Sequence, residues 1–462
     1  MKKALSIIAL SLITTSTFAQ SGIIDPEALA EIRQSYTQDS ANKALRNAIQ
    51  SNANLKTLSL DNDVVNGIDH TFKYEAKLNK TISDQHSSGR CWMFTSMNVL
   101  RPQLVEKFNL KSFDFSHNFN YFWDIFEKSN LFLENIIETA DRSIDDREVV
   151  DFFRSPVDDG GVWNHFYNVS KKYGVVPKEV MPETVHSNST SSMLAVIKEL
   201  LRKGGMDIRN ANDSKAKKAD LEAIKLSTLK DIYRTLALCL GEPPVQFDWK
   251  YTDCDGQVKV IENYTPLQFF ADITPENYTP DNYIMVMNDP TRPYYKVYDI
   301  KNYRNTAEGT NWVYLNLPNE EIKSAALKSI KAGESMYISC DVGKQLNSKA
   351  GMMAMGMYDI EALLGIDLTM DKRSRILSRQ SGSSHAMTLM ACDTDQNDNP
   401  TKWRVENSWG ASSGDKGYLT FTDEWFDNYI FRVVVKSNYL APKAVKALSG
   451  EVVELPVWDY MF

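Results

Sequence analysis

The sequence predicts an α+β fold, with helices in its first half and strands in its second. Two observations support this class. In the segments that begin near Gln85 and His117, apolar residues recur at steps of three and four, as they do on one face of a helix. After residue 331 the pattern changes to alternation, which is typical of strands. A helical half followed by a sheet half is the order of an α+β protein.

The helical half contains several amphipathic segments. The first starts at Cys91, and Pro102 should kink or end it near Arg101, because proline lacks the backbone N–H that a helix interior needs. Gly174 and Gly241 mark the ends of two others. The remaining helices are predicted over residues 117–134, 162–173, 192–202, 215–240 and 320–331.

The predicted strands lie between turns rich in Asp, Asn and Gly. They cover residues 336–340, 386–392, 402–407, 417–421 and 431–436, with an earlier strand-like run over 283–287. Ahead of all these elements, residues 20–60 are polar with an amphipathic piece over 32–49. We expect them to form an N-terminal arm that lies over the body of the protein.

Composition excludes some classes of function. The chain has 462 residues, 43% of them hydrophobic and 24% charged, which is ordinary for a globular protein with a large core. Its net charge of −8 argues against general nucleic-acid binding, so no nucleic-acid partner is expected.

The N-terminus has the pattern of a secretory signal. Two lysines follow the initial methionine, an apolar run covers residues 4–13, and Thr17 and Ala19 supply the small residues of a cleavage site. We expect cleavage after Ala19, a mature chain that begins at Gln20, and export to the periplasm or the medium. No cysteine follows the cleavage site, so no lipid or membrane anchor is expected on the mature chain.

The cysteines are too few and too scattered for a disulfide framework. They lie at positions 91, 239, 254, 340 and 392, and their odd number leaves at least one thiol free. Cys239 and Cys254 are close enough in sequence to form a bridge. No Cys-x-x-Cys or His-Glu-x-x-His spacing occurs, so neither a metal nor another cofactor is expected.

One cysteine has the setting of a nucleophile. The stretch from Gln85 to Phe94 reads Gln-His-Ser-Ser-Gly-Arg-Cys-Trp-Met-Phe, which places Cys91 at the start of a helix. Unpaired N–H groups and the helix dipole favour a thiolate there, and a nearby imidazolium lowers the cysteine pKa further. A buried structural cysteine is the alternative for an isolated Cys-Trp pair.

Two later segments favour the nucleophile. His385 begins an apolar run, and Asn407 ends the alternating segment Trp-Arg-Val-Glu-Asn-Ser-Trp-Gly. Cysteine, histidine and asparagine in this order, with Gln85 six residues before Cys91, form the pattern of papain-like thiol proteases. The chain resembles their bleomycin hydrolase and aminopeptidase C branch, which has Gly-Arg-Cys-Trp at the nucleophile. The resemblance extends from about residue 60 to the C-terminus.

The resemblance implies a papain-like fold of two lobes with a large, mainly helical insertion. It also implies peptide substrates and a homo-oligomer, a hexamer in the family, in which the insertion supplies contacts. On this basis the chain divides into a signal peptide (1–19), the N-terminal arm (20–60), a helical catalytic lobe (61–180), the insertion (181–330), a β-rich catalytic lobe (331–445) and a C-terminal arm that enters the active-site cleft (446–462).

The resemblance also implies a role for each matching residue. Cys91 attacks the peptide carbonyl, His385 exchanges the proton, and Asn407 orients the imidazole. Gln85 and the Cys91 N–H donate to the oxyanion, where one donor is typically worth ~3–4 kcal/mol. Trp409 shields the hydrogen bond between His385 and Asn407 from water.

Substrate binding is expected at two places. Gly160 and Gly161 match paired glycines along which the substrate backbone binds, because only positions without side chains allow that approach. In the aminopeptidases of the family, the C-terminal carboxylate meets the α-amine of the substrate. This chain stops at Phe462, about three residues sooner than its relatives, so the carboxylate falls roughly 10 Å short. An aminopeptidase with some endopeptidase or short-peptide-releasing activity is therefore expected.

Two other classes of function compete with this one. A secreted binding protein could keep a peptidase fold without turnover, although all four catalytic positions are filled. A cysteine amidase or a transglutaminase-like enzyme shares the Cys-His chemistry, but usually lacks the segments around Cys91 and Asn407. Labelling by an epoxide inhibitor of thiol proteases distinguishes an active nucleophile from an inert scaffold.

Overall fold

The structure is a computed structural model that describes residues 22–36, 40–77 and 81–461. It divides into two compact units. One contains the chain up to Leu60 together with Ile360–Gly365, and the other contains Asp61–Asp359 and Ile366–Phe462. The boundary at residue 60 coincides with the predicted end of the N-terminal arm. The predicted signal peptide (1–19) and Phe462 lie outside the described residues.

The smaller unit consists of four short helices. They are α1 (Pro26–Gln34), α2 (Ser40–Gln50), α3 (Leu55–Leu58) and α14 (Ile360–Leu364). The start of α1 follows from local chemistry, because the Asp25 side chain accepts a hydrogen bond from the Ala28 N–H (2.8 Å) and Pro26 occupies the first turn. That this arm covers the body stays a prediction.

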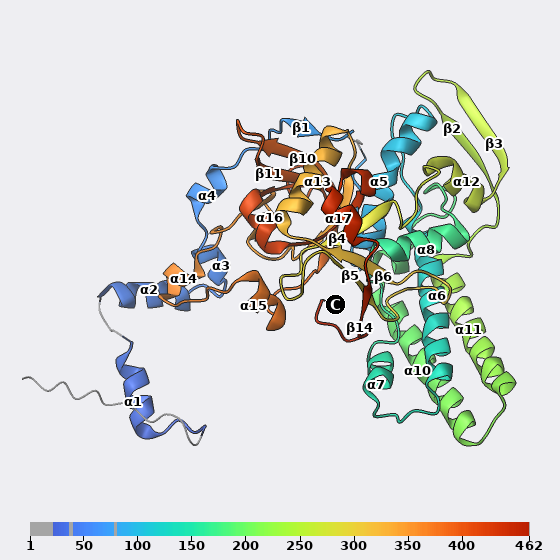
Figure 1. Ribbon diagram of the computed structural model, residues 1–462, viewed down its shortest axis with the longest axis horizontal. Coiled ribbons are helices and arrows are strands. Elements are labelled where there is room, and N and C mark those ends of the chain that lie inside the picture. The colour runs from blue at the N-terminus through green and yellow to red at the C-terminus, as the bar shows by residue number, and fades with distance from the viewer. Residues whose placement is uncertain (1–21, 37–39, 78–80, 462) are drawn as a thin grey trace, which may run out of the picture. The chain divides into compact units, whose positions relative to one another are not determined.

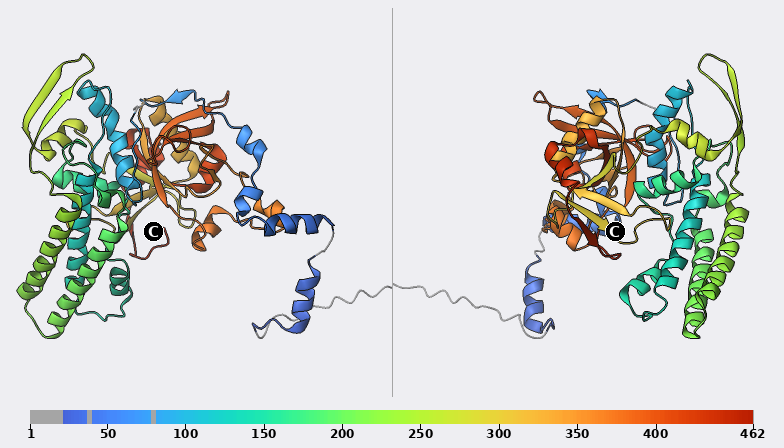
Figure 2. Two further views of the ribbon diagram at one scale, coloured as in Figure 1. Left: turned by 180° about the vertical axis from the view of Figure 1, so that it is seen from behind. Right: turned by 45° about the vertical axis from the view of Figure 1, so that its right-hand side comes forward.

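The helical lobe of the larger unit is built from α5 (Cys91–Lys107), α6 (His117–Glu138), α8 (Trp163–Tyr173), α10 (Ser191–Asp213) and α11 (Lys218–Leu240). The long helices α6, α10 and α11 run side by side (Figures 1 and 2). Shorter helices connect them or cap the sheet: α4 (Asn62–Asn66), α7 (Arg147–Arg154), α9 (Val185–Asn188), α12 (Pro266–Ile273), α13 (Asn319–Lys331), α15 (Lys372–Leu377), α16 (Asp423–Tyr429), α17 (Pro442–Ala447) and the 3₁₀ helix Ser437–Tyr439.

Two helices differ from the sequence prediction. Helix α5 continues through Pro102 to Lys107, so of the two predicted effects of Pro102, a kink or an end near Arg101, the end is wrong. Leu100 and Leu104 are both buried in the core, and this packing outweighs the one helix hydrogen bond that proline removes. Helix α10 is eleven residues longer than the predicted end at residue 202, because Asp213 is its last residue.

Glycine inside α10 has a packing role. A Cβ on Gly204 would lie 2.5 Å from the hydroxyl of Thr228 on α11, so this position must be glycine for the two helices to approach so closely. Interhelical packing therefore compensates for the low helix propensity that made this segment hard to predict.

The strands of the described chain form one twelve-stranded sheet and a separate hairpin. The main sheet has the order β14-β5-β6-β4-β13-β7-β10-β11-β12-β9-β8, and β1 also pairs with β10. Its strands are β1 (Tyr74–Glu75), β4 (Tyr283–Met287), β5 (Lys296–Ile300), β6 (Trp312–Asn316), β7 (Met336–Cys340), β8 (Leu346–Asn347), β9 (Met352–Met353), β10 (His385–Thr394), β11 (Pro400–Glu406), β12 (Tyr418–Thr422), β13 (Ile430–Lys436) and β14 (Val452–Leu455). The hairpin joins β2 (Phe247–Thr252) and β3 (Val258–Tyr264).

The predicted insertion at 181–330 differs from the expectation of a mainly helical region. Its first part is helical, but β4, β5 and β6 belong to the main sheet, where β4 pairs with β13. The strand-like run predicted over 283–287 is β4, whereas the Tyr- and Pro-rich composition of this stretch obscured β5 and β6. Every residue of β4 is buried, so its apolar run packs on both faces of the sheet.

The five later strand predictions agree with the structure to within two residues at each end. They also determine where the site lies. His385 is the first residue of β10, and Asn407 directly follows β11, its antiparallel neighbour. Helix α5 packs against β10 and β7, and its N-terminal residue Cys91 lies at the end of these strands where His385 is found. Among the described residues, no helix is both long and apolar enough to cross a membrane.

Candidate active site

The nucleophile turn is held by an aspartate that precedes the glycine pair. Cys91 is the first residue of α5, and no side chain caps this helix, so its first N–H groups are free of intrahelical bonds. The Asp159 carboxylate accepts from the Gly89 N–H (2.7 Å), and the Asp159 carbonyl accepts from Trp92 Nε1 (2.9 Å). The loop that contains Asp159 is therefore hydrogen-bonded to the turn on both sides of Cys91.

His385 and Asn407 form the hydrogen bond expected from the sequence. His385 Nε2 lies 2.8 Å from Asn407 Oδ1, and both residues are buried. The Trp409 ring stacks on the imidazole with centroids 4.8 Å apart. With Nε2–H donated to the amide, Nδ1 is the nitrogen left to exchange a proton with a thiol.

Cys91 adjoins the histidine strand. The backbone N–H of Ala386, next to His385, donates to the sulfur of Cys91. Burial raises the pKa of Cys91 to about 11, against the lowering effect of that hydrogen bond. Burial likewise lowers the pKa of His385 to about 4, opposed by the bond to Asn407. Each group alone is thus neutral at pH 7, and the charged forms become favourable only as a thiolate–imidazolium pair.

Gln85 is fixed beside the same turn. Its Nε2 donates to the Ser88 carbonyl (2.6 Å), and its Oε1 accepts from the Ser408 hydroxyl (2.6 Å). The Gln85 N–H also donates to the Ser408 carbonyl (2.9 Å). A primary amide has two N–H donors, so one remains for an oxyanion after the bond to Ser88. Ser408, which the sequence analysis did not single out, directly follows Asn407 and so links Gln85 to the asparagine segment.

A buried arginine joins the two segments of the site. Arg101 on α5 pairs with Glu406 (3.1 Å) and donates to the Ser83 hydroxyl (2.9 Å). Glu406 precedes Asn407, and Ser83 lies two residues before Gln85. Burial raises the pKa of Glu406 to about 7, although Arg101 acts against this shift. Arg101 therefore ties the strand of the asparagine to the segment of the glutamine.

The two glycines are not equivalent. The Gly160 N–H donates to Asp158 Oδ1 (2.9 Å), and its carbonyl accepts from Lys128 Nζ (2.5 Å), so both backbone groups already have partners. A Cβ on Gly161 would lie 2.6 Å from the Trp92 ring. The structure thus explains Gly161 by the packing of Trp92, a reason that differs from the expected approach of a substrate backbone.

The C-terminal arm is anchored residue by residue. The Arg147 guanidinium lies 4.2 Å from the centroid of the Trp458 ring, Arg292 pairs with Asp459, and the Met461 carbonyl accepts from Arg432 (2.9 Å).

The last of these contacts leads toward the catalytic strand. Arg432 also donates to the Ser339 hydroxyl (3.4 Å), and Ser339 is the cross-strand partner of Ala386. The arm therefore reaches the strand beside that of His385. Phe462, the expected substrate contact at the end of the arm, lies outside the described residues.

Comparison with known proteins identifies the family. The model of the Peptidase C1-like family matches residues 23–462. The chain belongs to this family. It is 37% identical over 421 residues to an aminopeptidase C of Lactobacillus delbrueckii subsp. lactis, covering 90% of this chain and 92% of the relative. It is 35% identical over 447 residues to human bleomycin hydrolase, covering 95% and 98%.

A solved structure of the family supports the fold. The crystal structure of pepw from Lactobacillus rhamnosis HN001 superposes with a TM-score of 0.91 at 35% identity, covering 95% of this chain and 99% of that one. The predicted resemblance and the papain-like α+β fold are confirmed. The chain is a cysteine peptidase of the Peptidase C1-like family.

The sequence analysis did not identify several residues that shape the site. Asp159, Lys128, Arg101 and Arg432 act through long-range contacts, which one sequence does not reveal. Asp159 alone had a local signal, since it precedes the glycine pair directly. All five cysteines are free thiols, and the described residues contain no cluster of metal-ligating side chains.

Proposed function

We propose that this cysteine peptidase is an aminopeptidase that cleaves peptides through Cys91, His385 and Asn407. The observation that carries the proposal is the arrangement of side chains at the N-terminal end of β10. The sulfur of Cys91 accepts from the amide next to His385, and the outer nitrogen of His385 is bonded to Asn407 at 2.8 Å. Curated relatives of similar length have the names aminopeptidase C and bleomycin hydrolase.

The reaction proceeds through a thioester. The Cys91 proton moves to His385 Nδ1, and the thiolate attacks the carbonyl carbon of the scissile bond. The imidazolium then gives its proton to the leaving amine as the C–N bond breaks. Water, deprotonated by the same imidazole, attacks the thioester and releases the acid. Asn407 keeps the ring in the orientation that both proton transfers need.

The oxyanion of each tetrahedral intermediate has two donors nearby. One is the backbone N–H of Cys91, which as the first helical residue has no intrahelical partner. The other is the second N–H of Gln85 Nε2. Because Ser88 and Ser408 hold the Gln85 amide from both ends, its donor is oriented before the substrate arrives.

The anchored C-terminal arm supports the preference for a free amino terminus. Its residues from Trp458 to Met461 reach the strand beside His385 and reduce the space ahead of the scissile bond. Release of single residues is therefore the expected main activity. One observation favours a second outcome, release of short peptides: a cavity of about 680 Å³ adjoins both the arm and Gly160.

Substrates that differ only at the amino terminus test this proposal. An aminoacyl reporter with a free amine is compared with N-blocked peptides of increasing length, and the released fragments are identified by mass spectrometry. Fast release of single residues from free-amine substrates supports the aminopeptidase. Equal rates on blocked peptides would show an endopeptidase, and no hydrolysis of any substrate would refute a peptidase function.

Export and assembly are part of the proposal. The first nineteen residues support a signal peptide cleaved after Ala19, and N-terminal sequencing that found Met1 on the native protein would refute it. The family resemblance supports a homo-hexamer with contacts from residues 181–330. Light scattering that gave the mass of one mature chain, which is less than the 52.5 kDa of all 462 residues, at micromolar concentration would refute the oligomer.

A further inference from the structure

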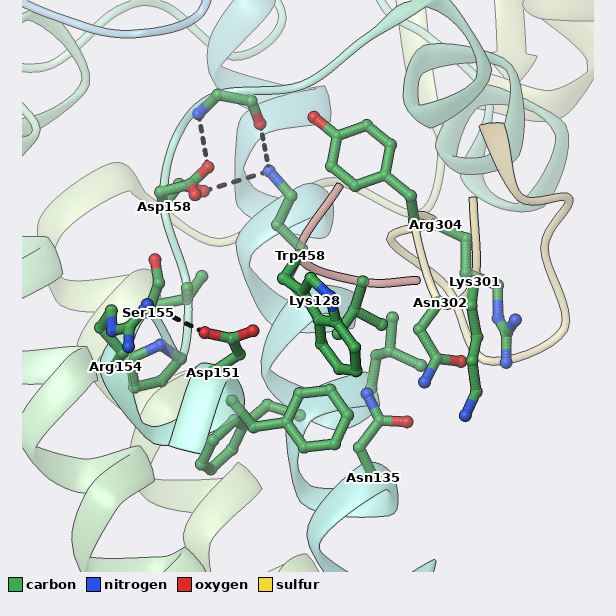
Figure 3. Close-up of a pocket in the computed structure, with 18 of the residues that line it drawn as sticks. Lys128, Asn135, Asp151, Arg154, Ser155, Asp158, Lys301, Asn302, Arg304 and Trp458 are labelled. Carbon is green, nitrogen blue, oxygen red and sulfur yellow. Dashed lines mark hydrogen bonds and ion pairs between the residues drawn. The ribbon is translucent and has the colours of Figure 1, made fainter. Parts of the chain in front are cut away.

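A large cavity lies between α7, the glycine loop and the C-terminal arm. Its volume is about 680 Å³, and its walls include Gly160, the loop at 301–304 and the arm residues Val457–Asp459 (Figure 3). In Figure 3, Trp458 stands between Asp151 and Arg154 on one side and Asn302 and Arg304 on the other. This volume is in the range of ligand-binding pockets in proteins.

The walls of the cavity are rich in cations although the chain as a whole is acidic. The lining cations are Lys128, Arg147, Arg154, Lys301, Arg304 and Arg379, against three lining carboxylates, those of Asp151, Asp158 and Asp459. The net charge of the whole chain is −8. The excess of positive charge is therefore local to this cavity and not a general property of the surface.

Half of these cations are neutralised by nearby carboxylates. Lys128 pairs with Asp124 (2.8 Å). Arg154 pairs with Asp151 (3.0 Å), and Lys301 pairs with Glu148 (2.9 Å).

The other three, which we call the arginine trio, are Arg147, Arg304 and Arg379. Within the described parts of the chain, no carboxylate forms an ion pair with any member of the trio. Arg147 lies over the Trp458 ring, and Arg304 donates to the neutral Asn311 side chain (2.8 Å).

The cavity borders the glycine loop, which packs on the nucleophile turn, and it follows the side of the C-terminal arm. Gly160 lines it, the adjoining Gly161 packs on Trp92, and Trp92 follows Cys91. The arm residues that line it lead on to Met461, whose carbonyl is held beside the catalytic strand. In the proposed function, this side of the site receives the residues ahead of the scissile bond.

We propose that the cavity is an extended substrate subsite in which the arginine trio binds aspartate or glutamate side chains of the peptide, two or more residues ahead of the scissile bond. This inference rests on the proposed peptidase function and adds a substrate class to it. Guanidinium groups form paired hydrogen bonds with carboxylates. No carboxylate of the described chain is paired with the three guanidinium groups, so they can form such bonds with a peptide. Basic peptide residues would be repelled by them.

Peptides that differ at one position test the subsite. Pentapeptides with a free amine carry Glu, Gln or Lys at the first position, which lies two or three residues ahead of the bond cut when a di- or tripeptide is released, and mass spectrometry follows which bond is cut and how fast. Because exposed ion pairs contribute modestly, we expect kcat/KM for release of the amino-terminal di- or tripeptide to be about three- to tenfold higher with Glu than with Gln. The preference should shrink in 1 M salt, where charges are screened.

A charge-matched pair of variants assigns the effect to the cavity. Arg379→Gln removes a trio member that has no ion pair to lose, and it should reduce the Glu preference to less than about twofold. Arg234→Gln makes the same charge change on an exposed face of α11, outside the cavity, and should leave the preference unchanged. A loss of preference in both variants would mean a general electrostatic effect and would overturn the subsite.

Other outcomes separate this inference from the proposed function. Equal rates for Glu, Gln and Lys peptides, or release of single residues only, would overturn the subsite while leaving the aminopeptidase intact. A single-stranded oligonucleotide that inhibited all three peptides equally, without any Glu preference, would assign the trio to nucleic acid and overturn it too. No hydrolysis of any peptide would refute the proposed function itself.

Discussion

Replacement of Asn407 by alanine tests the orienting role of this residue quantitatively. Asn407 Oδ1 accepts from His385 Nε2 (2.8 Å) and from the Ser408 N–H (2.8 Å). Alanine leaves the buried imidazole N–H without a partner, and an unpaired buried donor costs about 1–3 kcal/mol. If that cost falls on the reactive orientation of the ring, kcat decreases about 5- to 150-fold. KM should stay nearly unchanged, because Asn407 contacts His385 Nε2, the ring nitrogen that takes no part in the proton exchange with Cys91.

The assay measures kcat and KM with a free-amine aminoacyl reporter, together with the midpoint of thermal unfolding. Asn288→Ala is the matched control, because Asn288 is also buried, its Nδ2 donates to the Leu317 carbonyl (3.1 Å), and it directly follows β4, which two strands separate from β10 in the sheet. We expect the control to lose stability but not kcat. Wild-type kcat in Asn407→Ala, or equal loss in both variants, would refute the orienting role.

Three further predictions follow from the same contacts. His385→Ala should reduce kcat more than Asn407→Ala, because it removes the proton carrier; similar values in a kinetic comparison would contradict this. Gly161→Ala should lower the free energy of unfolding by about 1–3 kcal/mol, because its Cβ would lie 2.6 Å from the Trp92 ring. Gly343→Ala is the control, since no atom lies within 4 Å of the added Cβ, and it should leave the free energy of unfolding unchanged. Denaturant titrations of the two variants test this difference. Burial lowers the pKa values of His117 and His385 to about 4, so below pH 6.5 the unfolded chain binds more protons than the folded chain. The free energy of unfolding should therefore fall by up to about 3 kcal/mol per histidine between pH 6.5 and 4. A constant free energy of unfolding over this range would contradict the prediction.

The sequence was informative where a local pattern determines the structure. Alternating or apolar runs located β7 and β10–β13, and the chain order of Cys91, His385 and Asn407 matched a family pattern. The start of α5 followed from the small-residue turn before Cys91. These features depend on neighbours in sequence or on a known motif, so one chain is enough to read them.

Features that depend on tertiary contacts could not be predicted in this way. The continuation of α5 past Pro102 is decided by the burial of its neighbours, and the length of α10 by the close approach at Gly204. The run over 283–287 predicted β4, but β5 and β6 could not be distinguished from a loop until they pair in the sheet. The arginine trio comes from three segments, residues 147, 304 and 379, which only the fold brings to one cavity.

Labelling with an epoxide inhibitor of thiol proteases tests the central claim most directly. The five thiols differ in access: Cys340 and Cys392 are buried, Cys91 and Cys239 are half-buried, and Cys254 is exposed. The account predicts one label per chain, on Cys91, with complete loss of peptide hydrolysis, and no labelling of the Cys91→Ala variant. Labelling that followed exposure, on Cys254 first, with hydrolysis retained, would contradict the assignment of Cys91 as the nucleophile.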